Sequence, residues 1–228
     1  VRLQIESWKA RNVITQNEYF ILLATLLESV SFFANVAGVY AAFCKIWDKR
    51  ALKPFALKEI TLLYERASTN NAQNPRTKSI KNHRCFCGNC LEILDSHTGA
   101  PFDILYLDPP YNHRQYAPNY HLLETIAKYD NPCIKGVAGL REWQGQKSNF
   151  CNAKLAPLEL EKIAHSPHYK ALVLSYNSEG IMSKEQIEAI LRAQNGRVDF
   201  IELDYPRFKS HKNNAQKSIK EFVWILQR

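Results

Sequence analysis

The chain has 228 residues, a formal net charge of +8 at pH 7 and an apolar fraction of 46%. This length suits one domain, or one domain with an insertion, and supplies enough apolar side chains for a sizeable core. The composition excludes a fully disordered chain, and the positive charge suits a polyanionic partner without identifying one.

The N-terminal part of the chain is predicted to be helical. Residues 1–14 carry spaced apolar side chains that are typical of a short helix. Thr15 and Glu18 have the spacing of a capping box, in which both side chains satisfy free N–H groups at the start of a helix. A further helix is expected over residues 57–66, followed by a polar surface loop over residues 68–82.

Between these segments, residues 20–44 form an apolar run that is long enough to cross a membrane. Glu28 and Asn35 would be costly in lipid, so we prefer one or two buried helices that bend near Gly38. The six cysteines are not preceded by a secretory signal, which predicts reduced thiols and a cytoplasmic protein with no membrane association.

Three cysteines form the pattern Cys85-x-Cys87-x-x-Cys90, which raises a zinc hypothesis because three thiolates lie close in sequence. A fourth ligand would have to be His83, His97 or a distant residue. The spacing matches neither a four-cysteine site nor a site of two cysteines and two histidines. We therefore predict no metal site.

The same segment is interpreted as a strand over residues 84–87 that leads into a helix beginning near residues 88–89. Later helices and strands alternate, which is typical of an α/β sheet. The expected helices are 119–129, 157–165 and 183–193, and the expected strands are 171–174, 198–203 and 221–226.

The stretch 102–111 begins as an apolar run typical of a buried strand, and two consecutive prolines end it. A carboxylate that follows a parallel strand lies where open α/β sheets bind ligands, and the prolines fix the next turn. This combination suits a flat nucleic-acid base that carries an exocyclic amine. Asp108 and the Pro109 carbonyl would accept both N–H groups of the amine, while Tyr111 stacks on the ring of the base. The alternative is a turn that ends a strand with an acid on the surface.

The Asp-Pro-Pro-Tyr motif at residues 108–111 resembles the catalytic motif of S-adenosylmethionine-dependent amino methyltransferases that act on adenine in DNA. Residues 112–127, 174–180, 205–209 and 221–223 are similar to the corresponding blocks of a Dam-like group of adenine-specific DNA methylases. The blocks occur in the order found in that group. The resemblance implies a Rossmann-like methyltransferase sheet with an N-terminal helical region and a final antiparallel hairpin.

The resemblance also implies roles for single residues. Asp108, Pro109, Pro110 and Tyr111 would be catalytic, with S-adenosylmethionine as methyl donor and the N6 amine of a flipped adenine in double-stranded DNA as acceptor. Asp108 and Pro109 would contact the cofactor as well. Asn89 stands where the family carries an acid that receives the amine of the cofactor's adenine, and its carbonyl can accept that hydrogen bond without charge.

Contacts with DNA are expected from polar and basic side chains around and beyond the motif, although each taken singly also suits a solvated surface. The candidates are Arg114, Gln115, Tyr116, Arg141, Arg207, Lys209 and Lys212. The segment 134–150 has no clear period, and we favour a lid or DNA-contacting loop over a passive connector.

One expected motif is missing. The resemblance implies a Phe-x-Gly-x-Gly loop near the N-terminus that holds the methionine end of the cofactor, but no two of the eight glycines have Gly-x-Gly spacing. The chain also lacks an initiator methionine, which indicates processing, trimming or a fragment. We therefore expect a sheet that lacks its first one or two strands and is incomplete at its N-terminus.

Two functional hypotheses follow. The first is a site-specific adenine-N6 DNA methyltransferase of a bacterial restriction–modification system, with a cognate restriction endonuclease as partner. The second is a truncated or split subunit that binds DNA or a partner but is inactive alone, with a companion chain supplying the glycine loop. Residues 1–82 would form a helical target-recognition insertion, and residues 83–228 the catalytic core.

Overall fold

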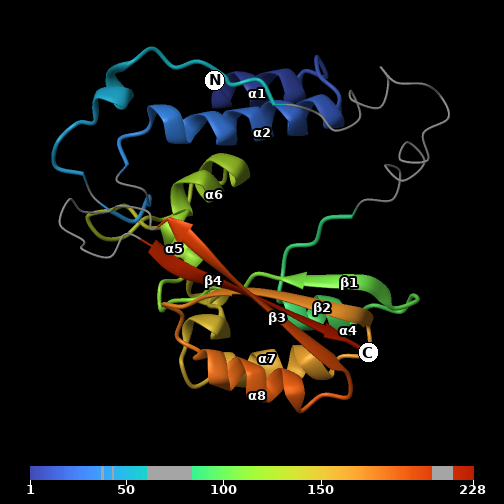
Figure 1. Cartoon of the computed structure of the whole chain (residues 1–228). Helices are drawn as coiled ribbons and strands as arrows, with labels where there is room; N and C mark the ends of the chain where they lie inside the picture. Colours follow the sequence, from blue (N-terminus) through green and yellow to red (C-terminus); the bar gives the residue numbers. More distant parts are fainter. Residues whose placement is uncertain (37–38, 43, 61–83, 207–217) are drawn as a thin grey trace, which may run out of the picture. The chain divides into compact units, whose positions relative to one another are not determined.

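The computed structural model describes residues 1–36, 39–42, 44–60, 84–206 and 218–228 (Figure 1). It is a mixed α/β structure, which confirms the predicted fold class at that level. The described residues form two compact units. Unit 1 comprises Val1–Cys85 and Ala117–Gly145, and unit 2 comprises Phe86–Tyr116 and Gln146–Arg228.

Unit 2 is built on a four-stranded sheet of order β1-β2-β4-β3 (Figure 1). The strands are β1 (Phe102–Leu107), β2 (Tyr169–Asn177), β3 (Arg197–Pro206) and β4 (Ser218–Gln227). β1 and β2 are parallel, whereas β4 runs antiparallel to both β2 and β3. The expected parallel strand before the prolines and the expected antiparallel pair at the end of the chain are both present.

One face of this sheet is covered by α7 (Ala156–His165) and α8 (Lys184–Arg192), which lie beneath it in Figure 1. Alternate side chains of β2 and β4 point into the resulting core, where Leu172, Leu174 and Trp224 are fully buried. Burying each of these leucines stabilises the fold by about 1.5–3 kcal/mol. The core of unit 2 therefore lies between the two central strands and these helices.

The opposite face remains open in the described structure. Ile104 of β1 is 64% exposed and Ile201 of β3 is 45% exposed. β1 is also an edge strand, since β2 is its sole neighbour among the described strands. The expectation that β1 is buried was therefore wrong, because an apolar run indicates a strand but not which elements cover it.

Unit 1 contains α1 (Arg2–Ala10), α2 (Gln16–Phe33), α6 (His121–Lys128) and the short η1 (Lys49–Leu52). The capping box is confirmed, because the side chain of Thr15 accepts the Glu18 N–H and the Glu18 carboxylate accepts the Thr15 N–H. α2 ends in an extended residue, Ala34, before the expected bend at Gly38, which lies outside the described residues. No described helix is long and apolar enough to span a membrane.

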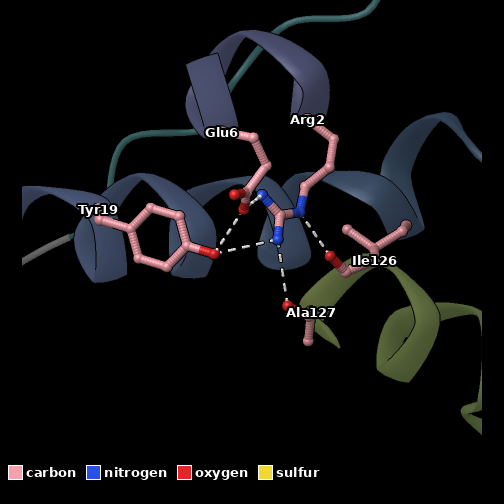
Figure 2. Close-up of polar contacts among 5 residues, drawn as sticks. All are labelled: Arg2, Glu6, Tyr19, Ile126 and Ala127. Carbon is pink, nitrogen blue, oxygen red and sulfur yellow. Dashed lines mark hydrogen bonds and ion pairs between the residues drawn. The ribbon is translucent and has the colours of Figure 1, made fainter. Parts of the chain in front are cut away.

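Arg2 ties the three longer helices of unit 1 together (Figure 2). Its guanidinium donates to the carbonyls of Ile126 at 2.6 Å and Ala127 at 3.2 Å, near the end of α6. It also donates to the Tyr19 hydroxyl at 3.1 Å and pairs with Glu6. The last carbonyls of a helix lack intrahelical partners and favour a cation, so this contact holds α6 to α1 and α2 within unit 1.

The region before β1 differs from its predicted structure. Residues 84–89 form no strand, and α4 (Cys90–Asp95) follows directly, with Asn89 as its N-cap. The expected helix start is confirmed, whereas the strand at 84–87 was wrong. Residues 57–60 are not helical, and the remainder of the helix expected there lies outside the described residues, as does the loop at 68–82.

Candidate active site

The Asp-Pro-Pro-Tyr motif lies at the carboxyl end of β1. Leu107, the last residue of this strand, pairs with Leu174 of β2, and Asp108 follows it on the surface. Pro109 is buried, while the Tyr111 side chain is 37% exposed. A proline cannot donate a ladder hydrogen bond, so the strand ends here and the acid and the aromatic ring are displayed beyond it.

The backbone carbonyl of Tyr111 is held by the segment that follows β2. The Ile181 N–H donates to this carbonyl at 2.8 Å, and the Tyr176 hydroxyl lies 3.5 Å from it. The same hydroxyl accepts the Met182 N–H at 3.3 Å. Burial raises the pKa of Tyr176, which keeps this phenol protonated and able to donate. The turn after the prolines is therefore anchored to the next parallel strand.

The end of β2 brings a second polar group into the site. The Asn177 side chain is buried, accepts the Glu179 N–H at 2.8 Å and donates to the Glu221 carboxylate at 3.4 Å. Burial raises the pKa of Glu221, and the hydrogen bond from Asn177 opposes this shift. The negative charge of Asp108 raises the same pKa further, since a like charge disfavours ionisation.

Glu221 was not predicted as a site residue. Its sequence signal lay in the block 221–223, which contributed to the resemblance without suggesting a role. Only the register of the sheet, in which Asn177 pairs with Glu221, brings this acid to the end where β1 stops. Carboxylates, a backbone carbonyl and an exposed aromatic ring are together suited to a flat ligand that carries an amine.

Asn89, the predicted cofactor residue, caps α4. Its side-chain oxygen accepts the Leu91 N–H at 2.9 Å and stays exposed. An amide oxygen has two lone pairs, so a second hydrogen bond remains available to it. Among the described residues no group of three metal-ligating side chains occurs, and His83 lies outside them.

The predicted DNA-contacting residues have different environments. Arg114 is exposed at the surface of unit 2, and Tyr116 is exposed as well. The Gln115 side chain accepts the Ser148 N–H at 2.7 Å and donates to the Ser148 carbonyl at 3.1 Å, so it already joins two segments of unit 2. Arg207, Lys209 and Lys212 lie outside the described residues.

Arg141 has a structural partner instead of a free surface position. Its guanidinium is 9% exposed and binds both oxygens of Asp130, at 3.2 and 2.5 Å, and the Thr125 hydroxyl at 3.3 Å. The hydrogen bonds from Arg141 lower the pKa of Asp130. This pair closes the loop between them, in which Lys135 and Leu140 form a β-bridge. The geometry does not favour Arg141 as a phosphate contact, because its charge is already paired.

The chain matches the family model of the D12 class N6 adenine-specific DNA methyltransferase over residues 2–190. It belongs to this family, which confirms the resemblance to Dam-like adenine methylases. No solved structure matches the chain.

Three curated relatives align with the whole chain. It is 38% identical to the type II methyltransferase M.NlaIII of Neisseria lactamica and covers 64% of that protein. It is 35% identical to the modification methylase StsI of Streptococcus sanguinis and covers 33% of it. It is 34% identical to the type II methyltransferase M.FokI of Planomicrobium okeanokoites and also covers 33% of it. The chain therefore spans between one third and two thirds of these relatives.

Proposed function

We propose that the protein containing this chain transfers a methyl group from S-adenosylmethionine to the N6 amine of a flipped adenine in double-stranded DNA. The observation that carries this proposal is the exposed carboxylate of Asp108 at the carboxyl end of a parallel strand, beside an aromatic residue whose backbone is anchored. Membership of the adenine-specific family supports it.

In this proposal the chain supplies orientation and electrostatics. S-adenosylmethionine, when bound, supplies an electrophilic methyl group on a sulfonium. Asp108 and the Pro109 carbonyl accept the two N–H groups of the adenine amine, which favours a tetrahedral nitrogen and offsets its developing positive charge. Pro110 fixes the turn between them and Tyr111. The Tyr111 ring replaces stacking lost when the base leaves the duplex, which is worth about 1–3 kcal/mol.

The residues present fit part of the cofactor. Asp108, the Pro109 carbonyl and the second lone pair of Asn89 are acceptors that suit amines, including that of the cofactor's adenine. For the methionine end, the sequence contains no Gly-x-Gly pair that would let the backbone approach closely. We therefore propose that a companion segment or chain supplies that loop.

The open side of unit 2 supports such a companion. An unpaired edge such as that of β1 is able to accept a further strand, and the exposed Ile104 offers apolar surface next to it. Ile201, on β3 at the opposite edge, adds apolar surface to the same face. We propose that the described sheet is part of a larger Rossmann-like methyltransferase sheet, with the missing strands beside β1. A subunit that is inactive without its companion is the second candidate function, and this exposed surface is the observation that favours it.

DNA contacts are proposed for Arg114 and Tyr116, which are exposed, and for Arg207, Lys209 and Lys212. We propose that Gln115 supports DNA binding by positioning the backbone next to Arg114. The relatives are named modification methylases and type II methyltransferases, so we propose a restriction–modification system with a cognate endonuclease as the biological setting.

The proposed function is tested by titrating the purified chain with S-adenosylmethionine in a calorimeter and assaying transfer of labelled methyl groups to DNA. Binding followed by N6-methyladenine formation supports an enzyme that is complete in this chain. Absence of binding that is restored by adding a segment with the glycine loop supports the split enzyme. Methylation of a base other than adenine would overturn the proposal.

A further inference from the structure

The Tyr176 side chain lies at the contact between β2 and the turn after the Asp-Pro-Pro-Tyr motif. It is 3% exposed, and its hydroxyl sits between the Tyr111 carbonyl at 3.5 Å and the Met182 N–H at 3.3 Å. The Ile181 N–H donates to the same carbonyl at 2.8 Å. A single backbone carbonyl of the motif is thus approached by two donors from one neighbouring segment.

Gly180 fixes the place of the Tyr176 ring. A Cβ atom at residue 180 would lie 2.0 Å from Cε1 of this ring, so any other residue would force the ring or the backbone to shift. The absence of a side chain lets the backbone pack flat against the ring. The ring is therefore confined between this backbone and the core, which leaves its hydroxyl little freedom to move away from Tyr111.

The backbone that confines the ring is itself held by β4. Ser178 donates its N–H to the Lys220 carbonyl at 2.9 Å, and the Ser178 hydroxyl accepts the Lys220 N–H at 3.1 Å. The Gly180 N–H donates to the Asn177 carbonyl at 3.0 Å, and the Asn177 side chain donates to Glu221. The turn over residues 177–180 is therefore anchored to the sheet before it contacts the motif.

We propose that Tyr176 is a positioning residue for methyl transfer, because it holds the backbone of Tyr111 so that the exposed ring meets the flipped adenine in the reactive orientation. The proposal rests on the proposed function, since it assigns Tyr176 a role in the same reaction. Tyr176 touches neither base nor cofactor in this mechanism and acts through Tyr111. A misplacement of about 1 Å in a reacting geometry can cost up to about 100-fold in rate.

The test compares Tyr176→Phe with Tyr169→Phe, in the purified protein together with any companion segment that its activity requires. Tyr169 is a matched control because it is a buried tyrosine on the same strand whose hydroxyl also donates to a backbone carbonyl, that of Ile163 at 2.8 Å. We expect Tyr176→Phe to lower kcat about 10-fold while KM for DNA changes little, and Tyr169→Phe to leave both unchanged. A duplex with 2-aminopurine at the target base should show weaker stacking on Tyr111 in the first variant alone.

Equal kcat values for the two variants, or losses that follow only the amount of folded protein, would overturn the proposal. If the unchanged protein methylates no DNA, the proposed function fails, and the positioning role is judged by amide hydrogen exchange instead. Faster exchange at Met182 and in residues 111–115 of Tyr176→Phe, and not of Tyr169→Phe, then supports the anchoring. Unchanged exchange in both variants rejects it. Gly180→Ala should reproduce the Tyr176→Phe pattern, since its Cβ displaces the same ring.

Discussion

The two faces of the sheet in unit 2 have opposite environments. On the covered face, Leu174 and Trp224 pair across β2 and β4 and are fully buried on the side that α7 and α8 cover. On the open face, Ile104 and Ile201 are apolar and exposed. Both faces carry apolar side chains, so composition alone does not distinguish them. The covered face stabilises unit 2, while the open face and its carboxyl end carry the candidate chemistry and the surface that we propose for a companion.

The largest expected effect is on the covered face. Trp224→Ala should destabilise the protein by about 3–5 kcal/mol, because it removes a large aromatic side chain from a close-packed core. Urea unfolding followed by circular dichroism measures this change. Trp47→Ala is the matched control, since Trp47 is 67% exposed, and its effect should stay within about 0.5 kcal/mol. Similar losses from the two variants would contradict the assignment of the core.

The covered face is also the part of the fold that the sequence predicts best. Alternating apolar residues in β2 and β4 reveal strands because one face of each is buried and the other is not. For Ile104 the same kind of signal was misleading, because no described element covers this side chain. The strand expected at residues 84–87 failed since a local β-prone pattern supplies no neighbouring strand to pair with.

The next largest effect concerns the open end of β1. Asp108→Ala should lower the rate of methyl transfer by about 100- to 1000-fold, because it removes an acceptor that stabilises the developing charge on the amine. DNA binding, measured by fluorescence anisotropy, should remain largely intact. Asp103→Ala is the control, since Asp103 is an exposed acid of the same strand whose partner is Lys170. If Asp108→Ala lost methylation and DNA binding to the same extent, the catalytic role proposed for Asp108 would be wrong.

The site itself was predictable only where its chemistry is local in sequence. Asp108 and Tyr111 belong to a short motif, and their residue types suggest base binding directly. Glu221 reaches the same place through pairing between distant segments, because the register of β2 and β4 sets it opposite Asn177. Arg141 illustrates what residue type alone does not give, because a basic residue in a loop suggests a phosphate contact but does not reveal the pairing of its guanidinium with Asp130.

A smaller effect is expected at Glu221, a carboxylate on the open face, where the contribution to the free energy of unfolding should depend on pH. The pKa of Glu221 is raised in the folded protein, mainly by burial, so the folded state binds its proton more tightly than the unfolded state. Its contribution to stability is complete below the unfolded pKa and is lost as pH rises through the folded pKa. Glu221→Gln should therefore increase the free energy of unfolding at pH 7 relative to the unchanged protein.

The increase should disappear below the ordinary pKa of a glutamic acid, where both proteins are uncharged at this position. Gln retains an oxygen that accepts the hydrogen bond from Asn177, so the substitution removes charge without removing the contact. Urea unfolding over a range of pH measures the difference. A gain that is independent of pH would show that packing, and not the charge beside Asp108, is responsible.

The smallest effect on stability is expected for an apolar residue of the open face. Comparing its effect on stability with its effect on association shows whether this face is a docking surface. Ile201→Ser should lower the free energy of unfolding of this chain by no more than about 1 kcal/mol, because Ile201 is already 45% exposed and contributes only part of the burial energy of an isoleucine. If a companion segment packs on this face, the same substitution should weaken its association, measured by calorimetric titration of the chain with that segment. Ile46→Ser, at an isoleucine of unit 1 that is 84% exposed, should affect neither quantity. Loss of association without loss of stability assigns the open face to the companion, whereas unchanged association places the companion elsewhere on the chain.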